Sequence, residues 1–236
     1  MKRLGVFGIA KVLALVFCVF LIALTGCSNG TTSNNRDMPI VCLGDSLTAG
    51  RSATTPGVDD MSKAYPAFLQ EKVKIPVINA GVSGNTTSQG LARVDSDVLS
   101  HDPQIVIIFL GANDLGWRIP LATIRDNLQG IINRVDNGNR KIYLTKVFSG
   151  IDASLTAMFG GVEYAAIIAM LGQFDDMLNT LASQNNVTVI EDIWKGISLT
   201  HISADNIHPN AAGYEIMANN ILNAIRPYLR EKNLLK

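Results

Sequence analysis

Short apolar segments alternate with longer amphipathic segments along the chain from residue 38 onward. Five apolar runs, the more central of them continuous, predict buried strands, at 39–43, 73–79, 104–110, 141–148 and 187–192. Apolar positions at helical spacing predict helices at 61–72, 89–100, 121–135, 162–183 and 211–229. Pro76 suggests that the second strand lies at a sheet edge or is irregular. The segment 149–161 is expected to be an open loop.

This alternation decides the fold class. Strands separated by helices predict a parallel sheet with helices on both faces. The expected fold is therefore α/β, a three-layer α/β/α sandwich around a central five-stranded parallel sheet. One such domain is expected over residues 38–236 of the 236-residue chain. In this architecture ligands bind at the carboxyl ends of the strands.

The first 37 residues do not follow this pattern. Lys2 and Arg3 precede an apolar run over 12–24, which leads into Leu24-Thr25-Gly26-Cys27. This arrangement resembles a bacterial lipoprotein signal peptide, which is cut just before the cysteine that receives the lipid. It predicts a signal peptide over 1–26 and a lipidated Cys27 at the start of a polar tether over 27–37. An uncleaved anchor helix over 5–26 is the alternative, although Lys11 interrupts it.

A lipid on Cys27 would hold the domain at a membrane of the cell envelope, on its periplasmic or extracellular face. Composition adds little about other partners. Twenty Lys and Arg residues balance twenty Asp and Glu residues, so nothing indicates a nucleic-acid partner. The three cysteines offer no disulfide framework and no Cys-x-x-Cys pair for a metal. We expect a monomer without metal or cofactor.

The segment Gly44 to Gly50 carries the first candidate for chemistry. Ser46 comes directly after the first predicted strand, where the chain turns into a helix. At such a bend the hydroxyl is exposed beside the free N–H groups of the first helical turn, a favourable position for a nucleophile. Asp and Ser are also favoured helix caps. From this segment alone, catalysis and capping remain equally open.

Further polar residues follow other predicted strands. Gly84 follows the second strand, Asn113 follows the third, and Asp205 and His208 lie in the loop past the fifth. The Asp-x-x-His spacing can place a carboxylate against one imidazole nitrogen while the other faces a serine. Singly, these residues can be a turn former, a positive-φ glycine or loop residues. Their joint placement at one sheet edge favours a catalytic site.

Two other kinds of site are disfavoured. A Gly-x-Ser-x-Gly elbow is missing, because Thr48 stands two residues after Ser46 and Asn85 stands two residues after Ser83. The turn between Gly81 and Gly84 lacks both a Walker A lysine and a full Gly-x-Gly-x-x-Gly pattern, so it does not predict a phosphate site. The remaining histidines, His101 and His201, are expected to be surface residues.

Four segments together resemble the motif blocks of the GDSL, or SGNH, hydrolases, in the order of that family. They are GDSLTAG at 44–50, SGNT at 83–86, GAND at 111–114 and DNIHPN at 205–210. The segment 79–93 is especially similar to the bacterial multifunctional arylesterase, lysophospholipase and thioesterase group. Two positions depart from the pattern: Asn85 stands where relatives often have Asp, and Ala112 where glycine is common.

The resemblance implies a flavodoxin-like fold and specific residue roles. Ser46 would be the nucleophile and Asp205–His208 the base pair. An oxyanion hole would consist of the backbone N–H groups of Ser46 and Gly84 and the side-chain amide of Asn113. The expected activity is hydrolysis of acyl or aryl esters through an acyl-enzyme on Ser46, with a small-molecule or lipid ester as partner and no cofactor.

Two other functions remain open at this stage. A carbohydrate O-acetylesterase would use the same groups on a different leaving group. A surface lipoprotein that binds a ligand with an inactive copy of the fold is less favoured, because all the catalytic groups are present. The apolar residues Trp117, Met158 and Phe159 favour lipid-like or aryl esters slightly.

Overall fold

A parallel sheet forms the centre of the computed structural model, which describes residues 38–151 and 162–236. Its strands run in the order β2-β1-β3-β4-β5. Their bounds are β1 Ile40–Gly44, β2 Val77–Gly81, β3 Ile105–Phe109, β4 Lys141–Thr145 and β5 Thr188–Ile190. The predicted five-stranded parallel sheet is confirmed, and β2 lies at an edge as expected.

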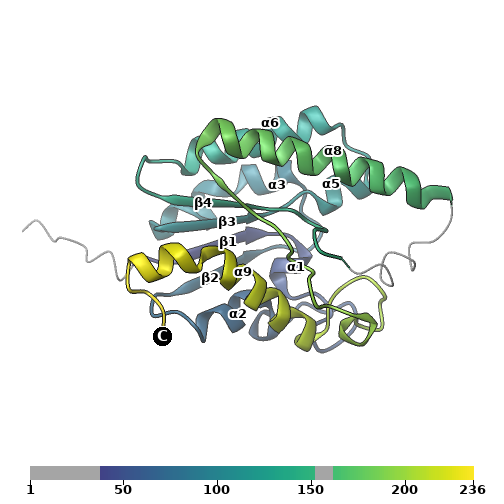
Figure 1. Cartoon of the computed structure of the whole chain (residues 1–236), viewed down its shortest axis with the longest axis horizontal. Coiled ribbons are helices and arrows are strands. Elements are labelled where there is room, and N and C mark those ends of the chain that lie inside the picture. Colours follow the sequence, from purple (N-terminus) through teal and green to yellow (C-terminus); the bar gives the residue numbers. More distant parts are fainter. Residues whose placement is uncertain (1–37, 152–161) are drawn as a thin grey trace, which may run out of the picture. The chain divides into compact units, whose positions relative to one another are not determined.

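Helices cover both faces of this sheet (Figure 1). The face above the sheet in that view carries α3 (Thr87–Ala92), α6 (Leu121–Val135) and α8 (Val162–Asn185). The opposite face carries α2 (Tyr65–Gln70) and α9 (Ala211–Glu231). The three-layer α/β/α arrangement is thereby confirmed. Within the described residues, no helix is both long and apolar enough to cross a membrane.

The core lies on both sides of the two central strands. Every residue of β1 and β3 is buried, as expected for strands covered by helices on both faces. The helix α6 contributes a buried stripe at helical spacing, made of Ile124, Leu128, Ile131, Ile132 and Val135. Cys42 is part of this core, and burial raises the pKa of its thiol to about 12.

The second strand was placed too early by the sequence. It begins at Val77, after Pro76, and not at Val73. Pro76 has no N–H to donate to a strand ladder, and Gln70 binds the chain on both sides of it. The Gln70 amide donates to the carbonyl of Ile75 (3.1 Å) and accepts from the N–H of Val77 (2.8 Å). Pairing with β1 starts only where both backbone groups are available.

Two predicted helices are broken into shorter pieces. The segment expected at 89–100 consists of α3, α4 (Val94–Asp97) and the 3-10 turn η2 (Leu99–His101). α3 starts early, at Thr87, because Thr86 and Gln89 form a capping box. Arg93 interrupts the helix with φ −110° and ψ 10°. The segment expected at 61–72 is likewise a 3-10 turn, η1 (Met61–Lys63), followed by α2, since Ala64 is extended.

Other predictions lie outside the described residues. These are the signal peptide over 1–26, Cys27 and its tether to residue 37, and most of the loop at 149–161. The helices expected at 121–135, 162–183 and 211–229 are present as α6, α8 and α9, with α8 and α9 two residues longer at their ends.

The strand order determines where a ligand can bind. The chain leaves β1 for one side of the sheet and β3 for the other, so the two connections diverge at the carboxyl ends of these neighbouring strands. α1 (Ser46–Ala49) follows β1, and α5 (Ala112–Gly116) follows β3. In a doubly wound sheet this is the place where a ligand is expected to bind, here between the turns that carry Ser46 and Asn113.

Candidate active site

Ser46 is the first residue of α1, directly after the buried strand β1. The helix is capped by Asp45, whose side chain accepts from the N–H of Leu47 at 3.0 Å. The capping role considered for Ser46 thus belongs to its neighbour, and the Ser46 hydroxyl is free for another partner. Gly44 is required for the tight entry to the turn, since a Cβ there would lie 1.9 Å from the Thr48 hydroxyl oxygen.

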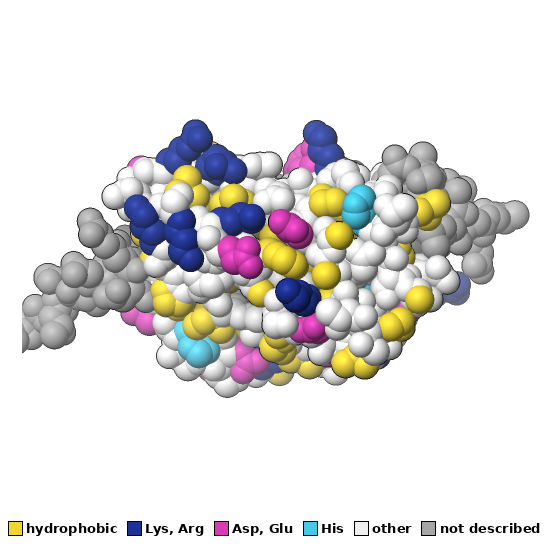
Figure 2. Space-filling model, turned by 90° about the horizontal axis from the view of Figure 1, so that it is seen from below, with side chains coloured by type: hydrophobic (Ala, Val, Ile, Leu, Met, Phe, Trp, Pro, Cys, Tyr) yellow, Lys and Arg dark blue, Asp and Glu magenta, His cyan; other side chains and the backbone are white. Residues whose placement is uncertain are grey.

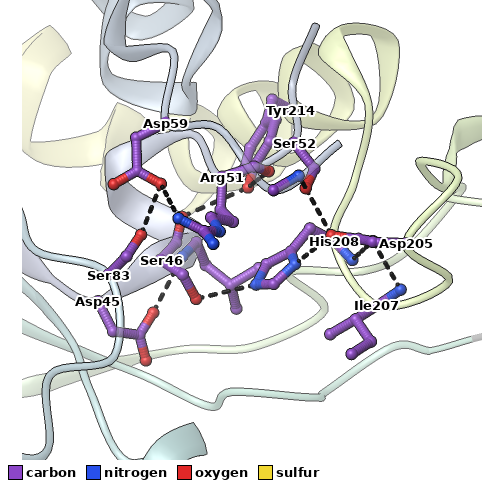
Figure 3. Close-up of polar contacts among 12 residues, drawn as sticks. Asp45, Ser46, Arg51, Ser52, Asp59, Ser83, Asp205, Ile207, His208 and Tyr214 are labelled. Atoms are coloured by element: carbon purple, nitrogen blue, oxygen red, sulfur yellow. Dashed lines mark hydrogen bonds and ion pairs between the residues drawn. The ribbon is translucent and has the colours of Figure 1, made fainter. Parts of the chain in front are cut away.

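Ser46, His208 and Asp205 form a continuous hydrogen-bonded line (Figure 3). The Nε2 atom of His208 lies 3.0 Å from the Ser46 hydroxyl oxygen. Its Nδ1 atom lies 2.7 Å from one carboxylate oxygen of Asp205. The structure therefore brings together three residues that the sequence placed at one edge of the sheet.

The surroundings of Asp205 keep its carboxylate ionised. Partial burial would raise its pKa, but hydrogen bonds outweigh that effect and hold the pKa well below its usual range. One oxygen accepts from the backbone N–H groups of Ile207 and His208, both at 2.9 Å. The other accepts from the Ser52 hydroxyl and faces His208. An ionised carboxylate only accepts, so the proton of the neutral imidazole lies on Nδ1, and Nε2 can accept the proton of Ser46.

Ser52 is a functional contact that the sequence did not reveal. Its side chain is almost fully buried, and its hydroxyl donates to Asp205 at 2.5 Å while accepting from the N–H of Gly57 at 2.8 Å. The contact joins positions 153 residues apart, so no local spacing signals it. Its place in the loop after the Ser46 turn is the only available hint.

The loop after Ser46 is held by three further contacts. The buried Tyr214 of α9 donates its hydroxyl to the carbonyl of Arg51 at 2.9 Å. Asp59 pairs with Arg51 at 3.2 Å and accepts from the hydroxyl of Ser83 at 2.7 Å (Figure 3). Through Asp59, the loop that follows Ser46 is connected to the turn that contains Gly84.

The expected oxyanion donors come from three turns. The N–H groups of Ser46 and Gly84 have no hydrogen-bond acceptor among the described residues. At Ser46 this is the ordinary state of a first helical residue. Gly84 has φ +84°, a conformation that favours glycine, and nothing lies within 4 Å of the position of a Cβ. Both N–H groups are therefore available to a ligand.

Asn113 stands at the start of α5, on the other side of the β1–β3 junction. Its amide nitrogen donates to the backbone carbonyl of Asn85 at 3.0 Å and, at a longer 3.4 Å, faces the carboxyl of Asp45. The neighbouring Asp114 is buried and binds the N–H and hydroxyl of Thr87 at 2.9 and 2.6 Å. These contacts fix α5 against the turn that follows β2.

The other predicted residues lie elsewhere. His101 is exposed on η2, as expected. His201 is half-buried, and its Nδ1 atom is 3.0 Å from the backbone nitrogen of Ser198, which it caps. No group of three or more His, Cys, Asp or Glu residues in the described ranges could hold a metal ion. Cys27, Met158 and Phe159 lie outside the described residues.

Asp45 precedes Ser46, and its side chain is fully buried. Burial raises its pKa to about 7, and the charge of Asp114 adds to the shift. A carboxyl with a raised pKa in the folded state contributes stability that is present below its unfolded pKa and is lost as pH rises toward the folded value.

We therefore predict that the free energy of unfolding falls between pH 4 and pH 7 more steeply in the natural protein than in Asp45→Asn, because the window is set by a folded pKa of about 7. Asn retains the capping oxygen and does not titrate. Urea unfolding at several pH values measures this slope. Equal slopes for the two proteins would contradict the assignment.

Comparison with known proteins agrees with this geometry. The model of the GDSL-like Lipase/Acylhydrolase family matches residues 42–216. The arylesterase of Vibrio mimicus is 31% identical over 113 residues, which are 46% of this chain and 54% of that protein. The thioesterase 1/protease 1/lysophospholipase L1 of Escherichia coli K12 is 28% identical over 192 residues, which are 80% of this chain and 83% of that protein.

A solved structure shows the same fold. The esterase EstA from Pseudoalteromonas, crystallised with monoethylphosphonate, matches with a TM-score of 0.64 at 22% identity, over 82% of this chain and 100% of that one. The family model spans β1 to α9 and includes Ser46, Asn113 and His208. This chain belongs to the GDSL-like lipase/acylhydrolase family and is a hydrolase of ester bonds.

Proposed function

We propose that the chain is a serine esterase that hydrolyses acyl or aryl esters, in the manner of an arylesterase or lysophospholipase, through an acyl-enzyme on Ser46. The observation that carries this proposal is the line from Ser46 through His208 to Asp205, with spacings of 3.0 and 2.7 Å. These are the distances over which a base can take a serine proton and be oriented by a carboxylate.

The first half of the reaction acylates Ser46. As its oxygen attacks the ester carbonyl, its proton moves to Nε2 of His208. The ionised Asp205 stabilises the resulting imidazolium through Nδ1. When the carbon–oxygen bond of the ester breaks, His208 returns the proton to the leaving alcohol or phenol. In the second half, His208 takes a proton from water, hydroxide attacks the acyl carbon, and Ser46 leaves with that proton.

The negative charge on the carbonyl oxygen needs donors. The N–H groups of Ser46 and Gly84, which have no acceptor among residues 38–151 and 162–236, supply two, and the Asn113 amide supplies the third. Asn113 keeps its 3.0 Å bond to Asn85, while its 3.4 Å approach to Asp45 is the weaker contact, which an oxyanion would replace. Donors fixed in advance stabilise the transition state without reorganisation at the moment of reaction.

Exposed apolar side chains around the site support lipid-like or aryl substrates. Trp117 and Ile207 are 64% and 59% exposed, and they follow Asn113 and precede His208 along the chain. The other large exposed apolar residues of the described chain are Val58, Met61, Val82 and Leu199. Val58 lies in the loop after α1, Val82 follows β2, and Met61 and Leu199 begin the 3-10 turns η1 and η4 (Leu199–His201). In Figure 2, Lys and Arg side chains gather mainly at the left, and hydrophobic side chains are scattered over the face shown, including its right-hand part.

The roles of the site residues are tested by point variants on short p-nitrophenyl esters. We predict that Ser46→Ala and His208→Ala lower kcat by about a thousandfold or more. Asn113→Ala should lower kcat by about a hundredfold with little change in KM, because its bond to the oxyanion forms in the transition state. His101→Ala is the matched control and should keep natural turnover. Near-natural kcat in Ser46→Ala or His208→Ala would defeat the assignment.

The substrate class is tested by a chain-length profile. With p-nitrophenyl esters from acetate to palmitate, we expect kcat/KM to rise beyond acetate before it falls, because each added methylene can bury against the apolar loops. Lysophosphatidylcholine should also be cleaved. A preference for acetate together with release of acetate from acetylated xylan would instead favour a carbohydrate O-acetylesterase.

We also propose a place in the cell envelope. A basic start, an apolar run and Leu24-Thr25-Gly26-Cys27 support removal of residues 1–26 and attachment of lipid to Cys27, with the polar residues 28–37 as the tether. The hydrolase domain over 38–236 would then act on esters at or near a membrane, on its periplasmic or extracellular face.

This anchor is tested on the full chain produced in a bacterium and extracted from membranes with detergent. The expected intact mass is that of a chain beginning at an acylated Cys27, and Cys27→Ser should abolish both the lipid and membrane retention. An unmodified Cys27, or a chain that retains residues 1–26, would contradict the proposal.

A further inference from the structure

Arg93 is a largely buried cation that the sequence motifs do not explain. Its side chain is only 14% exposed. Four of its N–H groups are bound: Nη2 donates to the carbonyl of Gly44, and Nη1 donates to the carbonyl of Ala80 and to Asp97, at 2.8, 2.8 and 2.9 Å. Nε donates to the side-chain oxygen of Asn85 at 2.8 Å. Arg93 thereby connects the ends of β1 and β2 with the turn that follows β2.

One of these contacts leads to the candidate oxyanion site. The side-chain oxygen of Asn85 accepts a hydrogen bond from Arg93. The backbone carbonyl of Asn85 accepts one from the side-chain amide of Asn113, at 3.0 Å. Among the described residues, the hydrogen bond to this carbonyl is the shorter of the two that the Asn113 amide makes. It fixes one amide hydrogen and thereby the direction of the other. Asn85 is only half-buried, and among the described residues Arg93 is the only hydrogen-bond partner of its side chain.

We propose that Arg93 is a positioning residue of this esterase, which acts through Asn85 to aim the Asn113 amide at the oxyanion. The inference rests on the proposed role of Asn113. A guanidinium is suited to this task because its N–H groups have a rigid planar arrangement and do not lose their protons. Three of its four acceptors belong to strand ends or to the turn that carries Gly84.

The location of Arg93 also accounts for the interrupted helix. The residue stands between α3 and α4 with φ −110° and ψ 10°, away from helical geometry. A continuous helix was expected here from the apolar spacing. The break coincides with the one residue of this segment whose side chain reaches the carbonyl of Gly44, 49 positions earlier in the chain. The helix is therefore interrupted at the residue whose side chain binds the end of β1.

The test uses Asn85→Ala, which removes one contact of Arg93 and leaves its bonds to Gly44, Ala80 and Asp97. We expect kcat for p-nitrophenyl esters to fall by about tenfold, with KM changed less than about twofold, because a misdirected donor affects the transition state more than substrate binding. Asn85→Asp keeps an oxygen for Nε and should restore kcat. Arg93→Met should lower kcat at least as much as Asn85→Ala.

Two controls separate positioning from general stability. Asp97→Ala removes the one Arg93 contact that leads away from the site, and it should keep natural kcat. Arg134→Met removes an exposed ion pair with Asp95 on the same side of the sheet and should also keep it. Urea unfolding of each variant shows whether the fold is retained, and Asn85→Ala keeps the inference testable should Arg93→Met fail to fold.

A double-variant cycle gives the decisive result. In the Asn113→Ala background, Asn85→Ala should lower kcat by less than about twofold, since the group it positions is gone. An equal loss in both backgrounds, or natural kcat in Asn85→Ala while Asn113→Ala is impaired, would overturn the inference. Natural kcat in Asn113→Ala itself would overturn the proposed oxyanion role, so the two failures are distinguishable.

Discussion

The ionised carboxylate of Asp205 determines the direction of the hydrogen bonds from Ser46 through His208 to Asp205. Donors from Ile207, His208 and Ser52 keep its pKa low despite partial burial, and an ionised carboxylate can only accept. This places the imidazole proton on Nδ1 and leaves Nε2 facing Ser46 at 3.0 Å. If Asp205 were protonated, it would be able to donate to Nδ1, and the imidazole could place its proton toward Ser46. The polarity of the whole line therefore depends on the donors around one carboxylate.

The sheet brings the remaining groups into range. Because β1 lies between β2 and β3, the turns after these three strands converge at one edge, each carrying one expected oxyanion donor. Their mutual distances are fixed by contacts between turns: Asp59 with Ser83, and Asn113 with Asn85. Because these contacts join the three segments, a displacement of one affects the geometry of the others. Fold and chemistry are thus linked at the strand ends.

The sequence predicted the sheet, its edge strand and the residues of the line, because these follow from local patterns. Apolar runs indicate strands, and Asp205 and His208 are three positions apart. Ser52 and Arg93 could not be found this way. Ser52 meets Asp205 across 153 positions, and Arg93 binds backbone carbonyls, which have no residue-type signature. Two predictions were wrong for the same reason: the start of the second strand at Val73 and the continuous helix through Arg93. At both places a side chain, that of Gln70 or of Arg93, binds backbone groups where regular secondary structure was expected.

The central claim is that Ser46 is activated by His208 to form a covalent intermediate. Reaction of the full chain with a fluorophosphonate, followed by proteolysis and mass spectrometry, tests it most directly, because the phosphorus bond forms only on an activated nucleophile. We predict a single adduct on the peptide that contains Ser46, greatly slowed in His208→Ala. An adduct on Ser52 or Ser83, or no adduct on the folded protein, would contradict the claim.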